Sequence, residues 1–211
     1  MGLFKRKPKA LDLSGFVMPG NIVPFGRFPI KSTSPEPIPW RVIETDMSSS
    51  TLISVYGLYY IRFYPGFNWD TRWERSIPRQ WLNNEFLAAA FTAQEREKLL
   101  HTQVCEHRSD ASSFSIHSCY DYVWLPSQKE LEEWFPDGDD GIYIYDTPFA
   151  IAQSKAVGAR KNRDSNHSYY WTRTTDLSGH VMFYCGNTPL RGSNLEDDIY
   201  AVRPVIRVDL T

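Results

Sequence analysis

The order of helix-like and strand-like segments is the feature that most constrains the fold of this chain. Capping-box patterns, Thr92 with Glu95 and Ser127 with Glu130, mark the starts of two helices. The second half of the chain instead carries short strand-like segments separated by polar loops, at 121–125, 141–146, 169–175, 180–186 and 200–210. Helices that come early and strands that come late predict an α+β fold and not a doubly wound parallel sheet.

A further helix is expected over residues 76–91. Ser76 can cap this helix, and Pro78 lies in its first turn, where a missing N–H costs nothing. The apolar residues recur at helical spacing and form one face: Ile77, Trp81, Leu82, Phe86, Ala89 and Ala90. We therefore expect a central packing helix and not a cofactor site, preceded by strands within 37–46 and 51–64.

The length of 211 residues suits one large domain. Gly15, Pro19 and Gly20 close a segment, 1–20, that we interpret as a disordered or extended tail. No break in composition divides residues 21–211, which we expect to form a single domain. A formal net charge of -2 argues against a nucleic-acid surface, which would need a strongly basic balance.

The sequence contains no apolar run of membrane-spanning length, and its N-terminus lacks the pattern of a signal peptide. Its three cysteines include no C-x-x-C pair and do not make a disulfide framework. The default location is therefore the reducing cytoplasm, of bacterial type.

Several catalytic signatures are absent from the sequence. It has no G-x-S-x-G elbow, no phosphate loop, no G-x-G-x-x-G opening a helix and no H-E-x-x-H. We assign no catalytic residue and expect no cofactor.

Residues 105–119 contain a symmetrical pattern, C-x-H, nine residues, then H-x-C. If this segment forms a hairpin centred on Ser112, one face carries the ligand set of a structural zinc site: Cys105, His107, His117 and Cys119. The one-residue spacers are shorter than the usual zinc knuckle, and a flat hairpin face converges poorly on a tetrahedral ion. A zinc site, a Cys105–Cys119 disulfide and free thiols all remain open at this point.

Two acidic segments resemble pieces of calcium-binding loops. Asp137 to Gly141 reads D-G-D-D-G, but Pro148 stands where a calcium loop has its bidentate glutamate. Residues 194–198, N-L-E-D-D, offer oxygen ligands without a spacing that identifies the ion. We favour surface turns over calcium sites for both segments, because Asp and Gly favour turns, and a structural calcium stays the alternative.

Eight short motifs occur in an order that resembles a bacterial domain family of unknown function. They are F-G-R-F-P, I-P-W-R-V-I-E, L-I-S, the 73–99 helix segment, T-x-V, D-Y-V-W-L-P-S-Q-K-E, Y-Y-W-T-R-T and A-V-R-P-V-I, and together they span about 23–210. The family resembles the C-type-lectin-like superfamily, which also holds formylglycine-generating enzymes and the target proteins of diversity-generating retroelements. The resemblance implies a C-type-lectin-like fold, with helices packed on a short-stranded antiparallel sheet and long loops.

Matching by position carries family motifs onto individual residues of this chain. The helix motif and the second segment match Trp81, Leu82, Asn83, Phe86, Leu87, Asp121, Val123, Leu125, Ser127 and Glu130. The closing strands match Trp171, Arg173, Arg203 and Pro204, while Thr172 and Thr174 replace a leucine and a serine. These are fold positions, and we expect a structural hub of Trp81, Asn83, Trp171, Arg173 and Arg203.

The first functional hypothesis is a non-catalytic binding module for a glycan, a peptide or another protein. Its candidate ligand-binding residues are aromatic or polar side chains outside the core positions of the motifs: Trp69, Tyr143, Tyr145, Arg160, Asn166, Tyr169 and Asn187. One alternative is an enzyme, either a relative of the formylglycine-generating oxidases or a metal-dependent activity at the Cys/His hairpin. Another is a receptor diversified by a retroelement, because 163–170 and 191–200 have a compatible composition.

Arg173 and Arg203 each place a guanidinium in an otherwise apolar strand. A guanidinium has five donors, and long loops leave many carbonyls in need of partners. We expect both side chains to be buried and hydrogen-bonded to loop carbonyls or carboxylates. Pro204 removes a ladder donor, which predicts an edge strand or a bulge at that point.

Overall fold

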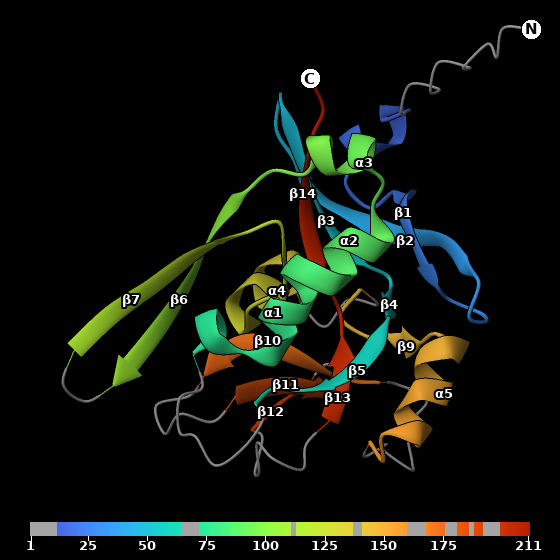
Figure 1. The fold of residues 1–211 in the computed structure, drawn as a ribbon. Coiled ribbons are helices and arrows are strands. Elements are labelled where there is room, and N and C mark those ends of the chain that lie inside the picture. The colour runs from blue at the N-terminus through green and yellow to red at the C-terminus, as the bar shows by residue number, and fades with distance from the viewer. Residues whose placement is uncertain are drawn as a thin grey trace, which may run out of the picture.

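The computed structural model describes residues 12–64, 72–110, 113–136, 141–159, 168–175, 181–185, 188–191 and 199–211. Strands and helices are both present, as expected for an α+β fold, and most described residues of regular structure are in strands (Figure 1). Among the described helices, none combines the length and the apolar character needed to cross a bilayer.

Two five-stranded sheets form the body of the molecule. The upper sheet in Figure 1 has the order β1 (Ile22–Pro29), β2 (Pro35–Thr45), β3 (Ser49–Ser54), β14 (Val205–Asp209) and β8 (Val123–Trp124). The lower sheet has the order β12 (Thr188–Arg191), β11 (Val181–Cys185), β10 (Tyr169–Thr175), β13 (Ile199–Val202) and β5 (Tyr59–Arg62). Neighbouring strands are antiparallel except β10 and β13, which are parallel.

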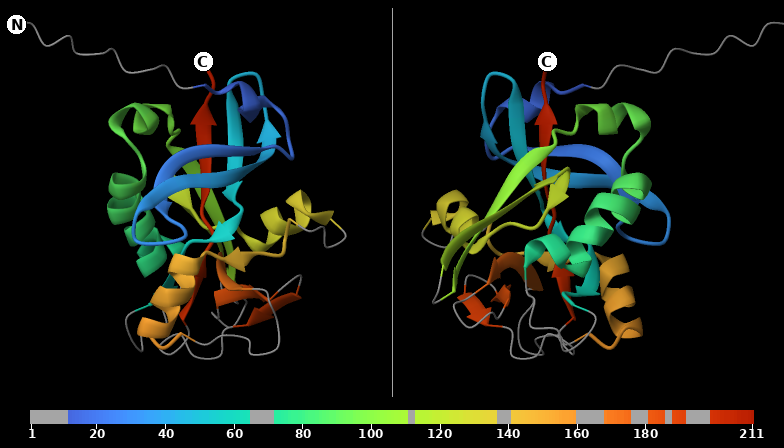
Figure 2. Two further views of the ribbon diagram at one scale, coloured as in Figure 1. Left: turned by 90° about the vertical axis from the view of Figure 1, so that its right-hand side faces the viewer. Right: turned by 60° about the vertical axis from the view of Figure 1, so that its left-hand side comes forward.

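Two smaller strand pairs complete the described sheets. β4 (Tyr56–Gly57) pairs in parallel with β9 (Tyr145–Asp146). β6 (Thr102–Asp110) and β7 (Ser113–Asp121) form a long antiparallel hairpin that projects from the body (Figures 1 and 2).

The chain passes between the two large sheets at two places that lie side by side. The first crossing follows β3 and the second separates β13 from β14. Ser54 donates its backbone N–H to the carbonyl of Pro204 over 2.9 Å, and Leu58 donates to that of Val202 over 3.0 Å. The expected strand 200–210 is therefore two strands, and Pro204 lies at a change of sheet, not in an edge strand or a bulge.

The predicted helix over 76–91 is confirmed, although it consists of three consecutive pieces. They are α1 (Ile77–Trp81), the π-helical segment η3 (Leu82–Phe86) and α2 (Leu87–Ala90). The Ser76 hydroxyl accepts the backbone N–H of Arg79 over 3.2 Å, and Pro78 lies in the first turn. A local cap therefore starts this helix where the sequence predicts it.

Both predicted capping boxes are confirmed. They begin α3 (Ala93–Lys98) at Thr92 and Glu95, and α4 (Gln128–Trp134) at Ser127 and Glu130. A further helix, α5 (Pro148–Ala156), lies among the later strands, where we expected no helix. Two short 3-10 helices, η1 (Ser14–Val17) and η2 (Trp73–Arg75), complete the described helical elements.

Aromatic rings fill much of the core between the sheets and the 77–90 helix. The largest fully buried side chains include Trp40, Trp73, Trp171, Tyr170, Tyr184, Phe63 and Phe86. Phe86 packs its ring 5.1 Å from Phe28 and 5.9 Å from Phe91. The contact with Phe28 attaches the helix to β1, as its expected role in packing requires.

Residues 12–20, which we expected to belong to the tail, include a packed segment. Phe16 in η1 is 2% exposed, and its ring lies edge-on to Phe25 with 5.8 Å between centroids. The carbonyl of Phe16 accepts hydrogen bonds from the hydroxyls of Thr45 and Ser50. The folded region therefore includes residues before 21.

Candidate functional site

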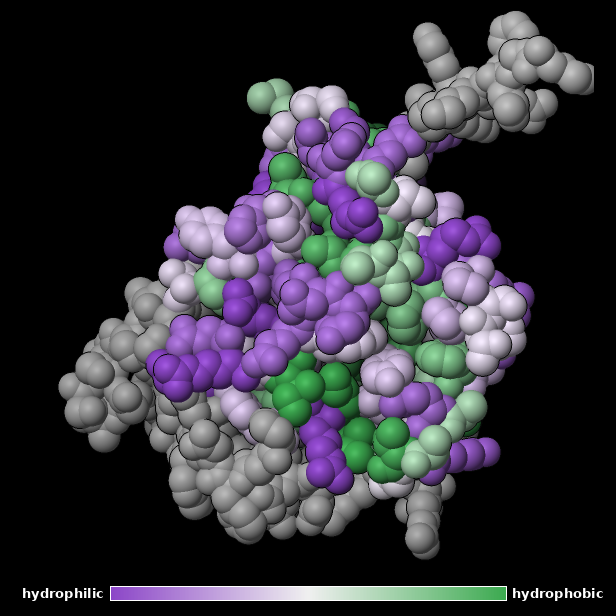
Figure 3. Space-filling model, viewed as in Figure 1, coloured by the Kyte–Doolittle hydropathy of each residue, from purple (hydrophilic) through white to green (hydrophobic). Residues whose placement is uncertain are grey.

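An apolar groove of about 470 Å³ lies where α1 and α5 approach the outer edge of the lower sheet. Its floor is β5 with Ile199 of β13, one wall is Ile77 and Trp81 of α1, and the other wall is Gln153 and Val157 at α5. Figure 3 shows green, hydrophobic surface on the lower part of the face that carries these elements in Figure 1. The groove combines helix side chains with the end strand of a sheet.

The floor and one wall of the groove meet in a stacked ring pair. Tyr59 and Trp81 have their centroids 4.8 Å apart and their planes 16° apart. Trp81 is only partly buried, and it is held from behind by Phe28 and Phe86, at 6.1 and 5.1 Å. Rings packed on both sides have little conformational freedom, so Trp81 is a rigid and partly exposed ring.

The π-helical segment begins immediately after Trp81. A π-helix inserts an extra residue per turn, and such segments are frequent at functional sites. Here the segment places Asn83 against the strand β8: its Nδ2 donates to the carbonyl of Val123 over 2.8 Å, and its Oδ1 accepts the N–H of Tyr122 over 2.9 Å. The two contacts fix the helix to the 122–123 segment two residues after Trp81.

Gln153 covers the outer edge of β5. Its Oε1 accepts the backbone N–H of Tyr60 over 2.8 Å, and its Nε2 donates to the Tyr60 carbonyl over 2.9 Å. The hydroxyl of Tyr60 donates to Oδ2 of Asp146 over 2.6 Å. Burial, reinforced by the Asp146 carboxylate, raises the pKa of Tyr60 well above its usual range, so this hydroxyl stays protonated as a donor.

The groove offers binding surface and few groups for chemistry. Its ionisable lining residues in the described part are two tyrosines and one arginine: Tyr59, Tyr60 and Arg62. Tyr60 is held protonated, and Arg62 lies exposed at the end of β5. This lining suits an apolar ligand with a negative group near Arg62.

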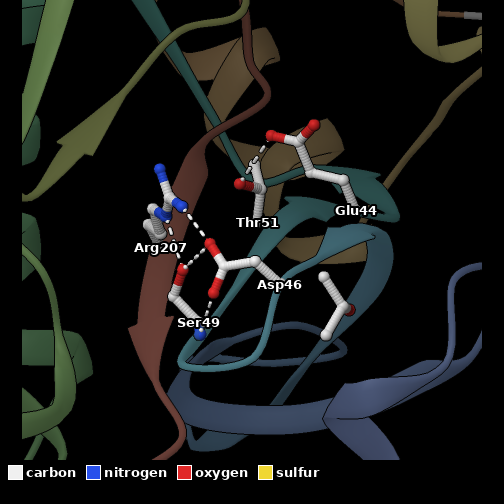
Figure 4. Close-up of a pocket in the computed structure, with 6 residues that line it drawn as sticks. Glu44, Asp46, Ser49, Thr51 and Arg207 are labelled. Carbon is white, nitrogen blue, oxygen red and sulfur yellow. Dashed lines mark hydrogen bonds and ion pairs between the residues drawn. The ribbon is translucent and has the colours of Figure 1, made fainter.

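A second, polar pocket of about 160 Å³ lies on the upper sheet at the β2–β3 turn (Figure 4). Asp46 accepts the backbone N–H groups of Ser48 and Ser49 over 2.8 and 2.7 Å, and the hydroxyls of both serines. Its Oδ2 also accepts Nη2 of Arg207 over 2.6 Å, and Glu44 accepts the Thr51 hydroxyl over 3.0 Å. These bonds close the turn, so the pocket serves the fold.

We expect Asp46 to give the protein a specific stability loss in acid. Hydrogen bonds from Ser48 and Ser49 hold the pKa of Asp46 well below its usual range. A carboxyl whose folded pKa is depressed contributes stability above its unfolded pKa, and that stability is lost as pH falls through the folded pKa. Urea unfolding from pH 6 to acid pH should show a steeper loss in the wild type than in Asp46→Asn; parallel curves would contradict this assignment.

Three of the predicted ligand-binding residues lie in the described part of the chain, and none lines the groove. Tyr143 and Tyr169 are partly buried and pack against the core. Tyr145 of β9 is 53% exposed. Trp69, Arg160, Asn166 and Asn187 lie outside the described residues. The described members of this set therefore do not form a common binding site.

Arg203 lies at the crossing between the two sheets and is 1% exposed. Its Nε donates to the carbonyl of Ser54 over 3.0 Å, and its Nη2 donates to that of Gly141 over 2.6 Å. The guanidinium lies 5.4 Å from the ring centroids of both Phe135 and Tyr170. Burial lowers the pKa of Arg203, which measures the cost of removing this charge from water.

Arg173 is 4% exposed and connects β10 to the start of α4. Its Nη1 and Nη2 donate to the two carboxylate oxygens of Glu130 over 2.5 and 2.6 Å, and Nη1 also donates to the carbonyl of Leu125 over 2.7 Å. Trp171 on the same strand is fully buried, and its Nε1 donates to the carbonyl of Ile61 over 2.8 Å. Burial with carbonyl or carboxylate partners is what we expected of both arginines.

We expect Asn83→Ala to lower the free energy of unfolding by about 2–3 kcal/mol, because the N–H and C=O of the buried Val123 and the N–H of Tyr122 lose their partner. The neighbouring Asn84 is exposed, and among the described residues it donates only to the Gln80 carbonyl of its own helix. Asn84→Ala is therefore the matched control and should change stability by less than about 0.5 kcal/mol. Equal effects of the two substitutions in urea titrations would contradict the bridging role of Asn83.

The Cys/His hairpin forms, but with a different register from the one we expected. Cys105 pairs with Ser118 and Cys119 with Val104, so neither the two cysteines nor the two histidines are cross-strand partners. Because side chains alternate along a strand, a slip of one residue puts the two halves of the pattern out of phase. The predicted pairing of Cys105 with Cys119 and of His107 with His117 is therefore wrong.

Cys119 is the one residue of this set whose side chain the structure describes; those of Cys105, His107 and His117 lie outside the described residues. Cys119 is a free thiol whose Sγ lies 3.4 Å from Oδ2 of Asp121. Burial, followed by the Asp121 charge, raises the pKa of Cys119 to about 12. In the described residues, no three potential metal ligands gather.

The acidic segments considered for calcium fall largely outside the described residues: of Asp137 to Gly141 only Gly141 is described, and 194–198 is not. Gly141 accepts a hydrogen bond from Arg203, as described above.

The groove residues were not among our predicted ligand-binding residues. The sequence predicts a packing helix for Ile77 and Trp81 and an ordinary strand for Tyr59. A signal was present, because Tyr59 and Ile61 alternate on β5 while Ile77 and Trp81 are four residues apart on one helix face. What the sequence does not reveal is that α5 lies across from them and leaves the rings partly open.

No curated protein and no solved structure matches the chain in the comparisons made. One family model does match, over residues 49–210, which include all the strands of the lower sheet and the groove. This range is well over half of the chain, so the protein belongs to the family described as Domain of unknown function (DUF6273).

Proposed function

We propose that this protein is a non-catalytic binding module whose groove holds an apolar segment of a partner polypeptide. The observation that carries the proposal is the stacked Tyr59–Trp81 pair, which is rigidly supported and only partly covered. Aromatic anchors in a concave, apolar site dominate the binding energy of many protein interfaces.

The groove favours a polypeptide over a glycan as its ligand. Aliphatic side chains flank the ring pair: Ile61, Ile77, Val157 and Ile199. A sugar presents many hydroxyls that need partners, whereas the Gln153 amide is already bonded to Tyr60. Apolar side chains of a peptide match this lining better, and Arg62 adds a site for one acidic group.

We also propose that the scaffold is related to the C-type-lectin-like superfamily and belongs to a bacterial family that acts in the reducing cytoplasm. The ordered motifs over 23–210 and the α+β architecture support the first part. Cysteine usage without a disulfide framework supports the second.

Selection from a displayed library of random peptides against the full chain tests the proposal. We expect retained peptides to be rich in large apolar residues and to bind Trp81→Ala at least about tenfold more weakly than the wild type. Trp134→Ala is the matched control, because Trp134 is a partly buried tryptophan of α4 that does not line the groove.

Two results would overturn the proposal. One is a library from which no peptide is retained. The other is a set of peptides that binds Trp81→Ala as tightly as the wild type, with both variants shown to be folded by near-ultraviolet circular dichroism.

A further inference from the structure

We infer that the ligand of the groove is an extended peptide that adds a strand to the outer edge of β5 and takes over the hydrogen bonds of Gln153. This inference rests on the proposed function and specifies how the partner segment is recognised. Its basis is the contact between a helix side chain and the edge of a sheet.

β5 is the end strand of the lower sheet in the described residues. On its inner side it pairs with β13, with Tyr60 opposite Ala201 and Arg62 opposite Ile199. The N–H and C=O of Tyr60 both bond to Gln153 and therefore face outward. Backbone groups two residues apart face the same edge, so Arg62 presents its own N–H and C=O on that side.

The Gln153 amide makes the same two bonds to Tyr60 that one residue of an added strand would make. It accepts from the N–H over 2.8 Å and donates to the carbonyl over 2.9 Å. A peptide backbone can replace it donor for donor and acceptor for acceptor, so no buried group is left unsatisfied in the exchange. The exchange requires Gln153 to leave this edge and α5, which packs against β5, to move outward, while the pairing of β5 with β13 stays intact.

The groove beside this edge is suited to the side chains of an added strand. Tyr59 and Ile61 share one face of β5, and Ile77 and Trp81 stand over it. Alternate residues of a paired peptide would enter this apolar space, because side chains on a strand alternate with period two. Arg62, exposed at the end of the edge, favours an acidic residue in the partner segment.

The ligand class is therefore an extended segment with large apolar residues at every second position and an acidic residue near one end. The alternative occupant, a helix laid into the groove, would show apolar residues at spacings of three and four. It would also leave the Gln153 bonds in place.

A positional-scanning library of acetylated, amidated octapeptides tests this mode on the full chain. We expect the preferred sequence to show period-two apolar positions, and single N-methylation of its backbone to weaken binding at least tenfold at alternate residues only. Gln153→Met removes the competing amide while keeping side-chain length, and should tighten binding a few-fold. Amide hydrogen exchange at Tyr60 and Arg62 should slow in the complex.

The outcomes separate this inference from the proposed function. Peptides that lose affinity for Trp81→Ala but tolerate N-methylation at every position would leave groove binding intact and overturn strand addition. Unchanged exchange at Tyr60 and Arg62, or weaker binding to Gln153→Met, would overturn it as well. A library without any binder would overturn the proposed function itself, and the inference with it.

Discussion

Arg203→Ala is expected to lower the free energy of unfolding by about 3–5 kcal/mol, because it leaves buried carbonyls unsatisfied and creates a cavity. Two carbonyls lose a close donor, those of Ser54 and Gly141. The rings of Phe135 and Tyr170 lose the guanidinium that lies between the segments they belong to.

One effect of the substitution opposes this loss of stability. Removing Arg203 also removes a buried charge, and the lowered pKa of this residue shows that burial disfavours its charged form. Each lost bond to a charged donor nevertheless costs about 1.5–3 kcal/mol, and the acceptors stay buried between the sheets. Arg203→Lys keeps the charge but not the planar fork, so it should still be clearly destabilising.

Arg207→Ala is the matched control for this experiment. Arg207 lies four residues further along and its side chain is 37% exposed in an ion pair with Asp46. Exposed pairs of this kind contribute about 0–1 kcal/mol. Urea unfolding followed by tryptophan fluorescence measures both variants. If the free energy of unfolding of Arg203→Ala lies within about 1 kcal/mol of the wild-type value, Arg203 does not stabilise the crossing between the sheets as we expect.

Helix starts were predictable from sequence because a cap is a local interaction. Ser76, Thr92 and Ser127 each accept a backbone N–H from the residue three positions ahead. The chemistry is therefore complete within four residues of sequence. α5 also has a capping residue, Thr147. Its apolar and polar residues do not separate onto opposite faces, however, so the sequence shows no helical periodicity there.

Strand pairing was less predictable because its partners are remote. The segment around Pro204 reads as one interrupted strand, yet its two halves join different sheets through β3 and β5. Nothing near Pro204 in the sequence indicates those partners. The predicted hairpin register is wrong for a related reason: a sequence that is symmetrical around Ser112 does not determine which residues pair. The hairpin is centred between residues 111 and 112, and this small difference changes every cross-strand pair.

The groove was missed because periodicity identifies an apolar face but not how completely it is covered. Trp81 belongs to the same helical face as Leu82 and Phe86, yet the latter two are buried and Trp81 remains partly open. Coverage depends on α5 and on the π-helical segment, which are tertiary features. Aromatic residues at the start of a predicted packing helix are consequently ambiguous between core and binding surface.

Glu130→Gln is expected to lower the free energy of unfolding by about 2–3 kcal/mol, because it leaves the buried charge of Arg173 without its counter-ion. Glutamine can still accept the Ser127 N–H, so the capping box of α4 is kept. The substitution thus separates the ion pair from the cap. It should also weaken the attachment of α4 to β10, which Arg173 makes through Glu130 and the Leu125 carbonyl.

The second capping box of the chain supplies the control. Glu95 is the corresponding residue of α3; it accepts the N–H groups of Thr92 and Gly26, and no arginine is bonded to it in the described residues. Glu95→Gln should therefore cost less than about 1 kcal/mol. A double-mutant cycle with Arg173→Met measures the coupling: its energy should exceed about 1.5 kcal/mol, well above that of an exposed pair. A coupling near zero, or equal losses for Glu95→Gln and Glu130→Gln, would show that the arginine merely fills space. A strong coupling would mean that β10 fixes the start of α4 through charge.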